Sequence, residues 1–114
     1  MGYDLKIKRI EPAAQITLDE WKHCISLDSE LEYVDFIEAT NPKTNETIRI
    51  ESVGMGVWRT EFNNEEFELT FSFRDGRRGS EISARYVDDF QIPKMKEIAG
   101  KLNAKVYGDE GEEY

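Results

Sequence analysis

The chain has 114 residues, with 24 acidic and 15 basic side chains that give a formal net charge of −9. This length suits one domain with a single hydrophobic core, and an aromatic content of 11% is too high for a disordered chain. The negative charge argues against binding to nucleic acid phosphates or to an anionic membrane, because both require an excess of Lys and Arg.

The first part of the sequence predicts a strand followed by a helix. Apolar and polar residues alternate over Tyr3–Lys8, which is the period of a half-buried strand. Thr17 precedes Glu20 by three residues, the spacing of a capping box at a helix start. Apolar residues then recur at helical spacing, so we expect a helix that ends near Asp28.

The middle of the chain, from Leu31 to Val87, has the pattern of an antiparallel meander. Alternation is most regular from Glu66 to Arg74, whereas the glycines at 54 and 56 weaken the prediction around them. We expect strands at 33–39, 47–51, 54–59, 66–74 and 82–86, separated by turns at 41–46, 62–65 and 75–79.

The last part predicts a second helix over 92–102, with Pro93 tolerated in its first turn and Asn103 as a left-handed terminator. A short strand at 104–107 and an acidic tail at 108–114 follow. The order of elements predicts one α+β domain over residues 1–107. We expect a mostly antiparallel sheet of five to seven strands with two main helices packed on one face.

The sequence shows no pattern that predicts a catalytic site. Adjacent carboxylates are frequent, but among 24 acidic residues such pairs are expected without any function. Cys24 and His23 are its only cysteine and histidine, and neighbouring positions on a helix point in different directions, so we do not expect a catalytic pair. A lone cysteine forms no internal disulfide, and no spacing predicts a zinc site. We therefore expect no enzyme activity, cofactor or metal. Because no signal peptide or membrane helix is evident, we expect a cytoplasmic protein.

One basic cluster interrupts the acidic sequence around the predicted turn at 75–79. It suits the binding of phosphate or of an acidic partner, or else it is a charged turn that keeps an edge strand from pairing. An alternative function is therefore a small ligand-binding domain or an enzyme that uses these arginines. The cluster consists of Arg74, Arg77, Arg78 and Arg85.

Negative charge is concentrated in three stretches without a base. Residues 28–38 hold five acids, residues 61–68 hold four, and residues 109–113 hold four. Such segregation favours electrostatic steering of a protein partner with a basic face, although acids on exposed strands also improve solubility.

Both ends of the chain resemble a group of small bacterial proteins, mostly uncharacterised. The matching motifs are Tyr3-Asp4-Leu5, Ile16-Thr17-Leu18-Asp19-Glu20-Trp21, Lys94-Met95, Ala104-Lys105-Val106 and Gly108-Asp109-Glu110-Gly111-Glu112-Glu113-Tyr114. Asn103 replaces the glycine usual before the last strand, and residues 31–86 do not match.

Proteins of this kind are often considered immunity proteins of toxin–immunity pairs, including contact-dependent growth inhibition systems. The resemblance implies a cytoplasmic inhibitor that binds one toxin domain, commonly a basic nuclease, and blocks its active site or the approach of its substrate. The oligomeric state stays open. We expect the partner surface to comprise acidic residues with Trp58 as an anchor, namely Asp28, Glu30, Glu32, Asp35, Glu38, Trp58, Glu65, Glu66 and Glu68.

Overall fold

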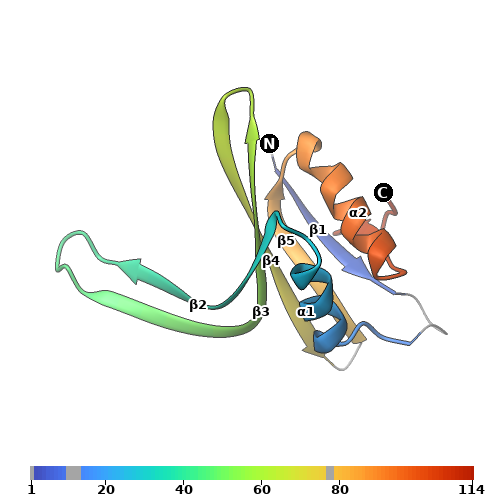
Figure 1. Cartoon of the computed structure of the whole chain (residues 1–114), viewed down its shortest axis with the longest axis horizontal. Helices are drawn as coiled ribbons and strands as arrows, with labels where there is room; N and C mark the ends of the chain where they lie inside the picture. The colour runs from blue at the N-terminus through green and yellow to red at the C-terminus, as the bar shows by residue number, and fades with distance from the viewer. Residues whose placement is uncertain (1, 10–13, 77–78) are drawn as a thin grey trace.

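The computed structural model describes residues 2–9, 14–76 and 79–114 (Figure 1). Its elements confirm the predicted α+β class. In chain order they are β1 (Tyr3–Lys8), α1 (Leu18–Ser26), β2 (Leu31–Thr40), β3 (Thr47–Phe62), β4 (Glu65–Gly76), β5 (Gly79–Val87), the 3-10 helix η1 (Asp89–Gln91), α2 (Ile92–Lys101) and β6 (Lys105–Gly108).

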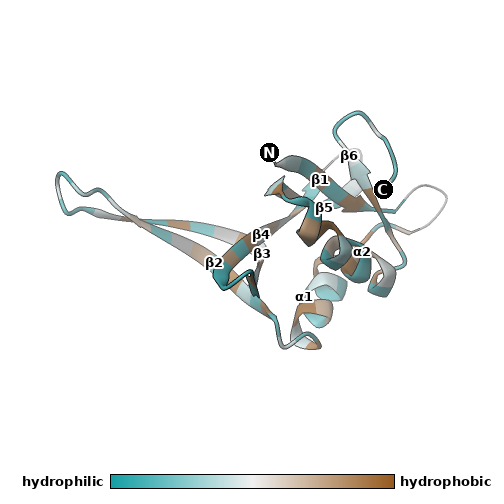
Figure 2. Cartoon of the chain, turned by 90° about the horizontal axis from the view of Figure 1, so that it is seen from above, coloured by the Kyte–Doolittle hydropathy of each residue, from teal (hydrophilic) through white to brown (hydrophobic). Residues whose placement is uncertain are grey.

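The strands form one antiparallel sheet in the order β2-β3-β4-β5-β1-β6. Both α-helices lie on the same side of this sheet, as predicted (Figure 2). Leu5 and Phe71 share one register row and lie in the core beneath the helices. Lys6 and Ser72 belong to the next row, and alternation along the strands places them on the opposite face, which we call the open face.

The capping box predicted at the start of α1 is present. The Glu20 N–H donates to Thr17 Oγ1 at 3.1 Å, and the Thr17 N–H donates to a Glu20 carboxylate oxygen at 3.0 Å. Arg9 binds the same carboxylate at 2.7 Å. The hydrogen bond from Arg9, followed by that from Thr17, lowers the pKa of Glu20 to about 2. The helix start is therefore tied to the end of β1.

One long strand replaces the two short strands expected at 47–51 and 54–59, because β3 runs without interruption from Thr47 to Phe62. Gly54 has a φ of 93°, which allows the strand to bend without ending. The pairing with β2 shifts between Val34 and Phe36, opposite this bend. The Gly54 N–H donates to the Tyr33 hydroxyl at 3.1 Å. The glycine that weakened the strand prediction therefore supplies a bend within one strand.

Beyond the bend, β2 and β3 form a hairpin that we call the arm, residues 36–51, and it projects away from the helices (Figure 1). Every side chain from 38 to 51 is exposed. The radius of gyration is 14.9 Å, against about 13 Å for a compact chain of this length. Residues 38–51 therefore contribute no side chains to the core.

The residues expected as an acidic tail fold back along β6. The Gly108 N–H donates to the Glu112 carbonyl at 2.8 Å, and the Tyr114 N–H donates to the Val106 carbonyl at 2.9 Å. Gly111, with a φ of 85°, makes the turn possible. The Tyr114 ring packs against the core, so this segment covers the outer edge of β6.

We predict that Gly56→Ala destabilises the fold by about 1–2 kcal/mol, because an added Cβ would lie 2.9 Å from Trp21 Cζ2 and 3.0 Å from Ile25 Cδ1. The matched control is Gly100→Ala in α2, where an added Cβ would have no atom within 4 Å besides those of its own helix backbone. This variant is expected to stabilise the fold by up to about 1 kcal/mol. Urea denaturation measures both changes. If Gly56→Ala were as stable as the wild-type chain, α1 would not pack closely on β3.

Candidate functional site

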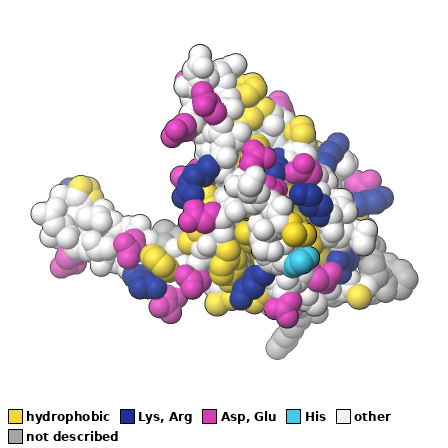
Figure 3. Space-filling view, in the orientation of Figure 1, with side chains coloured by type: hydrophobic (Ala, Val, Ile, Leu, Met, Phe, Trp, Pro, Cys, Tyr) yellow, Lys and Arg dark blue, Asp and Glu magenta, His cyan; other side chains and the backbone are white. Residues whose placement is uncertain are grey.

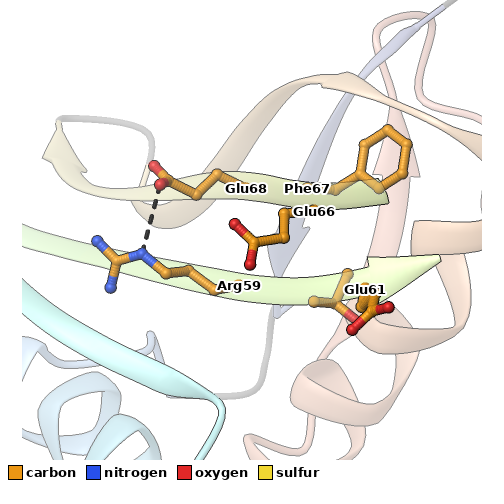
Figure 4. A pocket seen from close by; sticks show the side chains of 6 residues that line it. Arg59, Glu61, Glu66, Phe67 and Glu68 are labelled. Carbon is orange, nitrogen blue, oxygen red and sulfur yellow. Dashed lines mark hydrogen bonds and ion pairs between the residues drawn. The ribbon is translucent and has the colours of Figure 1, made fainter. Parts of the chain in front are cut away.

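Carboxylates from β3 and β4 face one another on the hairpin that joins these strands. The turn Asn63–Asn64, with φ values of 53° and 65°, has the left-handed backbone of a two-residue hairpin turn. It fixes a register in which Glu61 lies opposite Glu66 and Arg59 lies opposite Glu68. Figure 4 shows Arg59 bound to Glu68, with the two other carboxylates further along the same strands.

Arg59 is the basic residue at the centre of this group. It binds Glu68 at 3.3 Å and also forms an ion pair with Glu32 of β2. Hydrogen bonds with Glu32 and then Glu68 raise the pKa of Arg59, so its charge is constant. We define the acidic surface as these four carboxylates around one guanidinium, namely Glu32, Glu61, Glu66, Glu68 and Arg59.

Two of these carboxylates have no counterion within the described part of the chain. Glu61 and Glu66 are both exposed, directly opposite in register, and in no ion pair with a described residue. Like charges in opposite positions of a sheet are destabilising by about 0.2–1 kcal/mol. The acidic surface thus retains a repulsion that a single amide substitution would remove.

Aromatic stacking holds the hairpin in place. The Phe62 and Phe90 rings are stacked at 4.3 Å between centroids, and the Phe67 ring meets Phe90 edge-on at 5.0 Å. Phe90 belongs to η1, so the hairpin end is anchored to the segment before α2. Beside Phe67 the strands border a hollow of about 420 Å³, which is also lined by Glu61 and Glu66. This hollow has room for a side chain of a partner.

Asp28 lies inside the molecule, although the sequence placed it on the partner surface. Its Oδ2 lies 2.6 Å from Lys94 Nζ, and both side chains are 7% exposed. Glu30 and Glu97 approach the same ammonium group at 3.3 and 2.9 Å. Because Asp28 neutralises a buried lysine, we exclude it from the acidic surface.

Trp58 is also buried, with 7% of its surface exposed, and it belongs to the core. Lys94 Nζ lies 5.7 Å from the centroid of its ring. Among the described residues, no group accepts a hydrogen bond from its indole N–H. Trp58 therefore packs inside this chain and is not available as an interface anchor.

The other predicted partner residues are exposed but only partly clustered. The Arg59 guanidinium brings Glu32 and Glu68 together, and Glu66 lies beside them on β4. The backbone N–H of Arg59 donates to the Glu30 carbonyl at 3.5 Å. The remaining three residues lie apart from this group. Asp35 is at the bend, Glu38 is on the arm and Glu65 is beside the turn.

Glu61 was missing from the predicted site, although a signal for it existed. The turn predicted at 62–65 places residue 61 opposite residue 66 once its two central positions are assigned to Asn63–Asn64. The pairing of Glu61 with Glu66 is therefore predictable from the turn, but not from the charges of neighbouring residues in the sequence.

Arg74 and Arg85 line a second hollow, of about 500 Å³, on the open face. Ser72 and Ser83, which are opposite in register, lie between them along the strands. Guanidinium and hydroxyl groups together suit the binding of an anion. The other members of the predicted cluster, Arg77 and Arg78, lie outside the described residues.

Cys24 is 5% exposed and His23 is exposed. Burial is the main cause that raises the pKa of the Cys24 thiol, which disfavours the nucleophilic thiolate. Within residues 2–9, 14–76 and 79–114, no group of three or more His, Cys, Asp or Glu is placed to hold a metal ion. None of the described helices has the length and apolar character needed to cross a membrane.

Comparisons of the chain with protein-family models, with curated proteins and with solved structures found no match.

We predict that Asp28→Asn destabilises the fold by about 3 kcal/mol at neutral pH, because it leaves Lys94 buried with its closest counterion removed. The matched control, Glu97→Gln, removes a half-exposed partner of the same lysine and should cost less than about 1 kcal/mol. Urea denaturation of both variants measures the difference. Equal losses of unfolding free energy in the two variants would show that Asp28 stabilises Lys94 no more than Glu97 does.

The ion pair of Asp28 with Lys94 also predicts how the stability of the fold depends on pH. Burial disfavours the charged Asp28, but hydrogen bonds from Lys94 and from the Glu30 N–H outweigh it and lower its pKa below 3.8. A lowered pKa gives stability that is complete above the unfolded value and is lost as pH falls through the folded value. The free energy of unfolding should therefore decrease below about pH 4, and less steeply in Asp28→Asn.

Proposed function

We propose that the chain is an immunity-type inhibitor that binds and neutralises a cognate toxin domain, a basic nuclease, through its acidic surface. The observation that carries this proposal is the pair of opposed carboxylates, Glu61 and Glu66, held without a counterion from the described residues. The net charge of −9 and the resemblance of both ends to immunity proteins support it.

The acidic surface is suited to competition with a nucleic acid. A nuclease uses Lys and Arg to bind phosphates, and fixed carboxylates attract the same side chains. The carboxylates belong to paired strands that stacked phenylalanines anchor to η1, so little backbone conformational entropy is lost on binding. The hollow beside Phe67 is lined by Glu61 and Glu66 and accommodates a cationic side chain. Inhibition then results from occupying the nuclease residues that contact its substrate.

The repulsion within the acidic surface also favours a binding role. Charges kept only for solubility would be placed apart, because separation lowers the repulsion at no loss of solubility. Here the register keeps Glu61 and Glu66 opposite. A basic partner would relieve this repulsion, so binding and local stability are coupled at this pair.

We predict that the double variant Glu61→Gln/Glu66→Gln associates more slowly with the proposed toxin domain, by about threefold to tenfold at low salt. The candidate partner to test is the product of the neighbouring gene. The unfolding free energy of the double variant should rise by about 0.5 kcal/mol, because the repulsion is removed. Stopped-flow mixing and calorimetry measure binding, and urea denaturation measures stability.

The control Asp109→Asn/Glu110→Gln removes the same charge from exposed residues next to β6 and should leave the association rate nearly unchanged. The proposal fails if the wild-type chain does not bind the toxin domain at micromolar concentration. It also fails if both double variants slow association equally, or if the rate does not fall as salt increases.

A second candidate function, binding of a small anionic ligand, is favoured by the hollow between Arg74 and Arg85. Inorganic phosphate is the simplest probe, and we expect saturable shifts of the Ser72 and Ser83 amide resonances with a Kd on the order of 1 mM. Arg74→Gln/Arg85→Gln should abolish them, whereas Arg49→Gln on the arm should not. Shifts that grow linearly with phosphate, or that persist in the double variant, would exclude this site.

A further inference from the structure

The two edges of the sheet differ in how they are covered. At one edge, β6 spans four residues, and the chain end pairs with it through Tyr107 and Glu113. At the other edge, β2 spans ten residues and pairs with β3 alone among the described strands. An uncovered strand edge presents unpaired N–H and C=O groups that can pair with another chain. The outer edge of β2 is therefore the one to search for a partner.

The register identifies the backbone groups that point outward along the arm. The Asn41 N–H donates to the Glu46 carbonyl at 2.8 Å, so the backbone of Asn41 faces β3. Backbone groups alternate in direction along a strand, so Ala39 also faces β3, whereas Glu38 and Thr40 face away from it. The outward row lies within the arm, where every side chain from 38 to 51 is exposed.

The charges of β2 indicate which kind of strand can pair with it. Edge strands commonly avoid pairing by means of Lys or Pro, and β2 contains no Lys, Arg or Pro. It carries acids instead, at Glu32, Asp35 and Glu38, of which Glu38 lies on the arm and Glu32 is paired with Arg59. A second copy of this chain would bring these acids close to one another, and the repulsion disfavours such a pair. A strand with Lys or Arg opposite the acids would be attracted.

The two faces of the arm differ, which specifies the partner further. Ile48 and Ile50 are 59% and 54% exposed, and Ile48 is opposite Ala39 on the same face. Glu38 is opposite Arg49 on the other face. A strand added outside β2 would continue both faces, with apolar side chains beside Ala39 and basic side chains beside Glu38. A two-stranded hairpin is only marginally stable alone, so a third strand would also stabilise the arm.

We propose that the outer edge of β2 along the arm, residues 36–40, binds an extended segment in which basic and apolar residues alternate, by β-strand addition. The assignment of that segment to the toxin domain rests on the proposed function. The kind of segment that the edge binds does not depend on the proposed function, since it is inferred from the strand order, the register and the charges of β2.

The test uses the full chain and a short synthetic peptide of alternating Lys and Val, with a Glu and Val peptide as the matched probe. Hydrogen exchange is followed by NMR. The Lys peptide should slow exchange of the outward amides of Glu38 and Thr40 by a larger factor than that of Ala39, which already faces β3. The Glu peptide should produce no protection.

Two substitutions at one position separate the backbone from the charge. Glu38→Gln removes only the charge, whereas Glu38→Pro also removes the outward N–H without breaking a bond to β3. Glu38→Pro should weaken peptide binding at least about fivefold more than Glu38→Gln, as expected for one lost hydrogen bond. Unchanged exchange in the core of Glu38→Pro would verify that the variant is folded.

Equal affinities of the two variants would overturn the proposal, since the peptide would then bind by charge alone. Protection at Glu61 and Glu66 instead of the arm would overturn it as well. A dimer in sedimentation that Glu38→Pro abolishes would also overturn it, since the edge would then pair with a second copy of the chain. These outcomes are independent of the toxin. If the peptide binds as expected but Glu38→Pro binds the toxin domain like wild type, the edge binds strands and its assignment to the toxin is wrong. If the wild-type chain does not bind the toxin domain, only the proposed function fails.

Discussion

The packing of Trp21 on β3 is the contact on which the rest of the arrangement depends. Its indole N–H donates to the Gly54 carbonyl at 2.9 Å, and its ring occupies the space above Gly56. Glycine is needed at position 56 because a side chain there would collide with α1. It is needed at position 54 because the strand bends there with a positive φ. The same contact therefore holds α1 on the sheet and determines where the arm leaves it.

Because both helices cover one face, the strands that extend beyond them receive no core of their own. The arm and the β3–β4 hairpin project from the covered part of the sheet (Figure 1). Figure 3 shows acidic side chains along the arm at the left and on the hairpin at the top of the view. Strand pairing fixes the positions of these carboxylates although they contribute nothing to the core. The paired glutamates Glu61 and Glu66 and the proposed binding edge of β2 lie on these projections, where exposed charges stand on paired strands.

Local rules predicted the elements that depend on neighbouring residues. The capping box at Thr17 and the alternation along β4 needed only short-range spacing, and both were confirmed. Long-range contacts decided the rest. Local sequence predicted a break in the strand near Gly54, but pairing with β2 before and after the bend keeps β3 continuous. Asp28 is typical of an exposed acidic stretch, yet Lys94, which is 66 positions away, binds it in the interior.

The sequence by itself determined the fold class, the helix start, the alternating strands and a surplus of acid, because composition and short-range periodicity carry this information. Only the tertiary structure decided which acids lie together. A carboxylate can be neutralised by a lysine distant in sequence, as Asp28 is, or can face another carboxylate across a hairpin, as Glu61 and Glu66 do. The field at a surface depends on distances in space, which strand register and helix packing establish only when the chain folds.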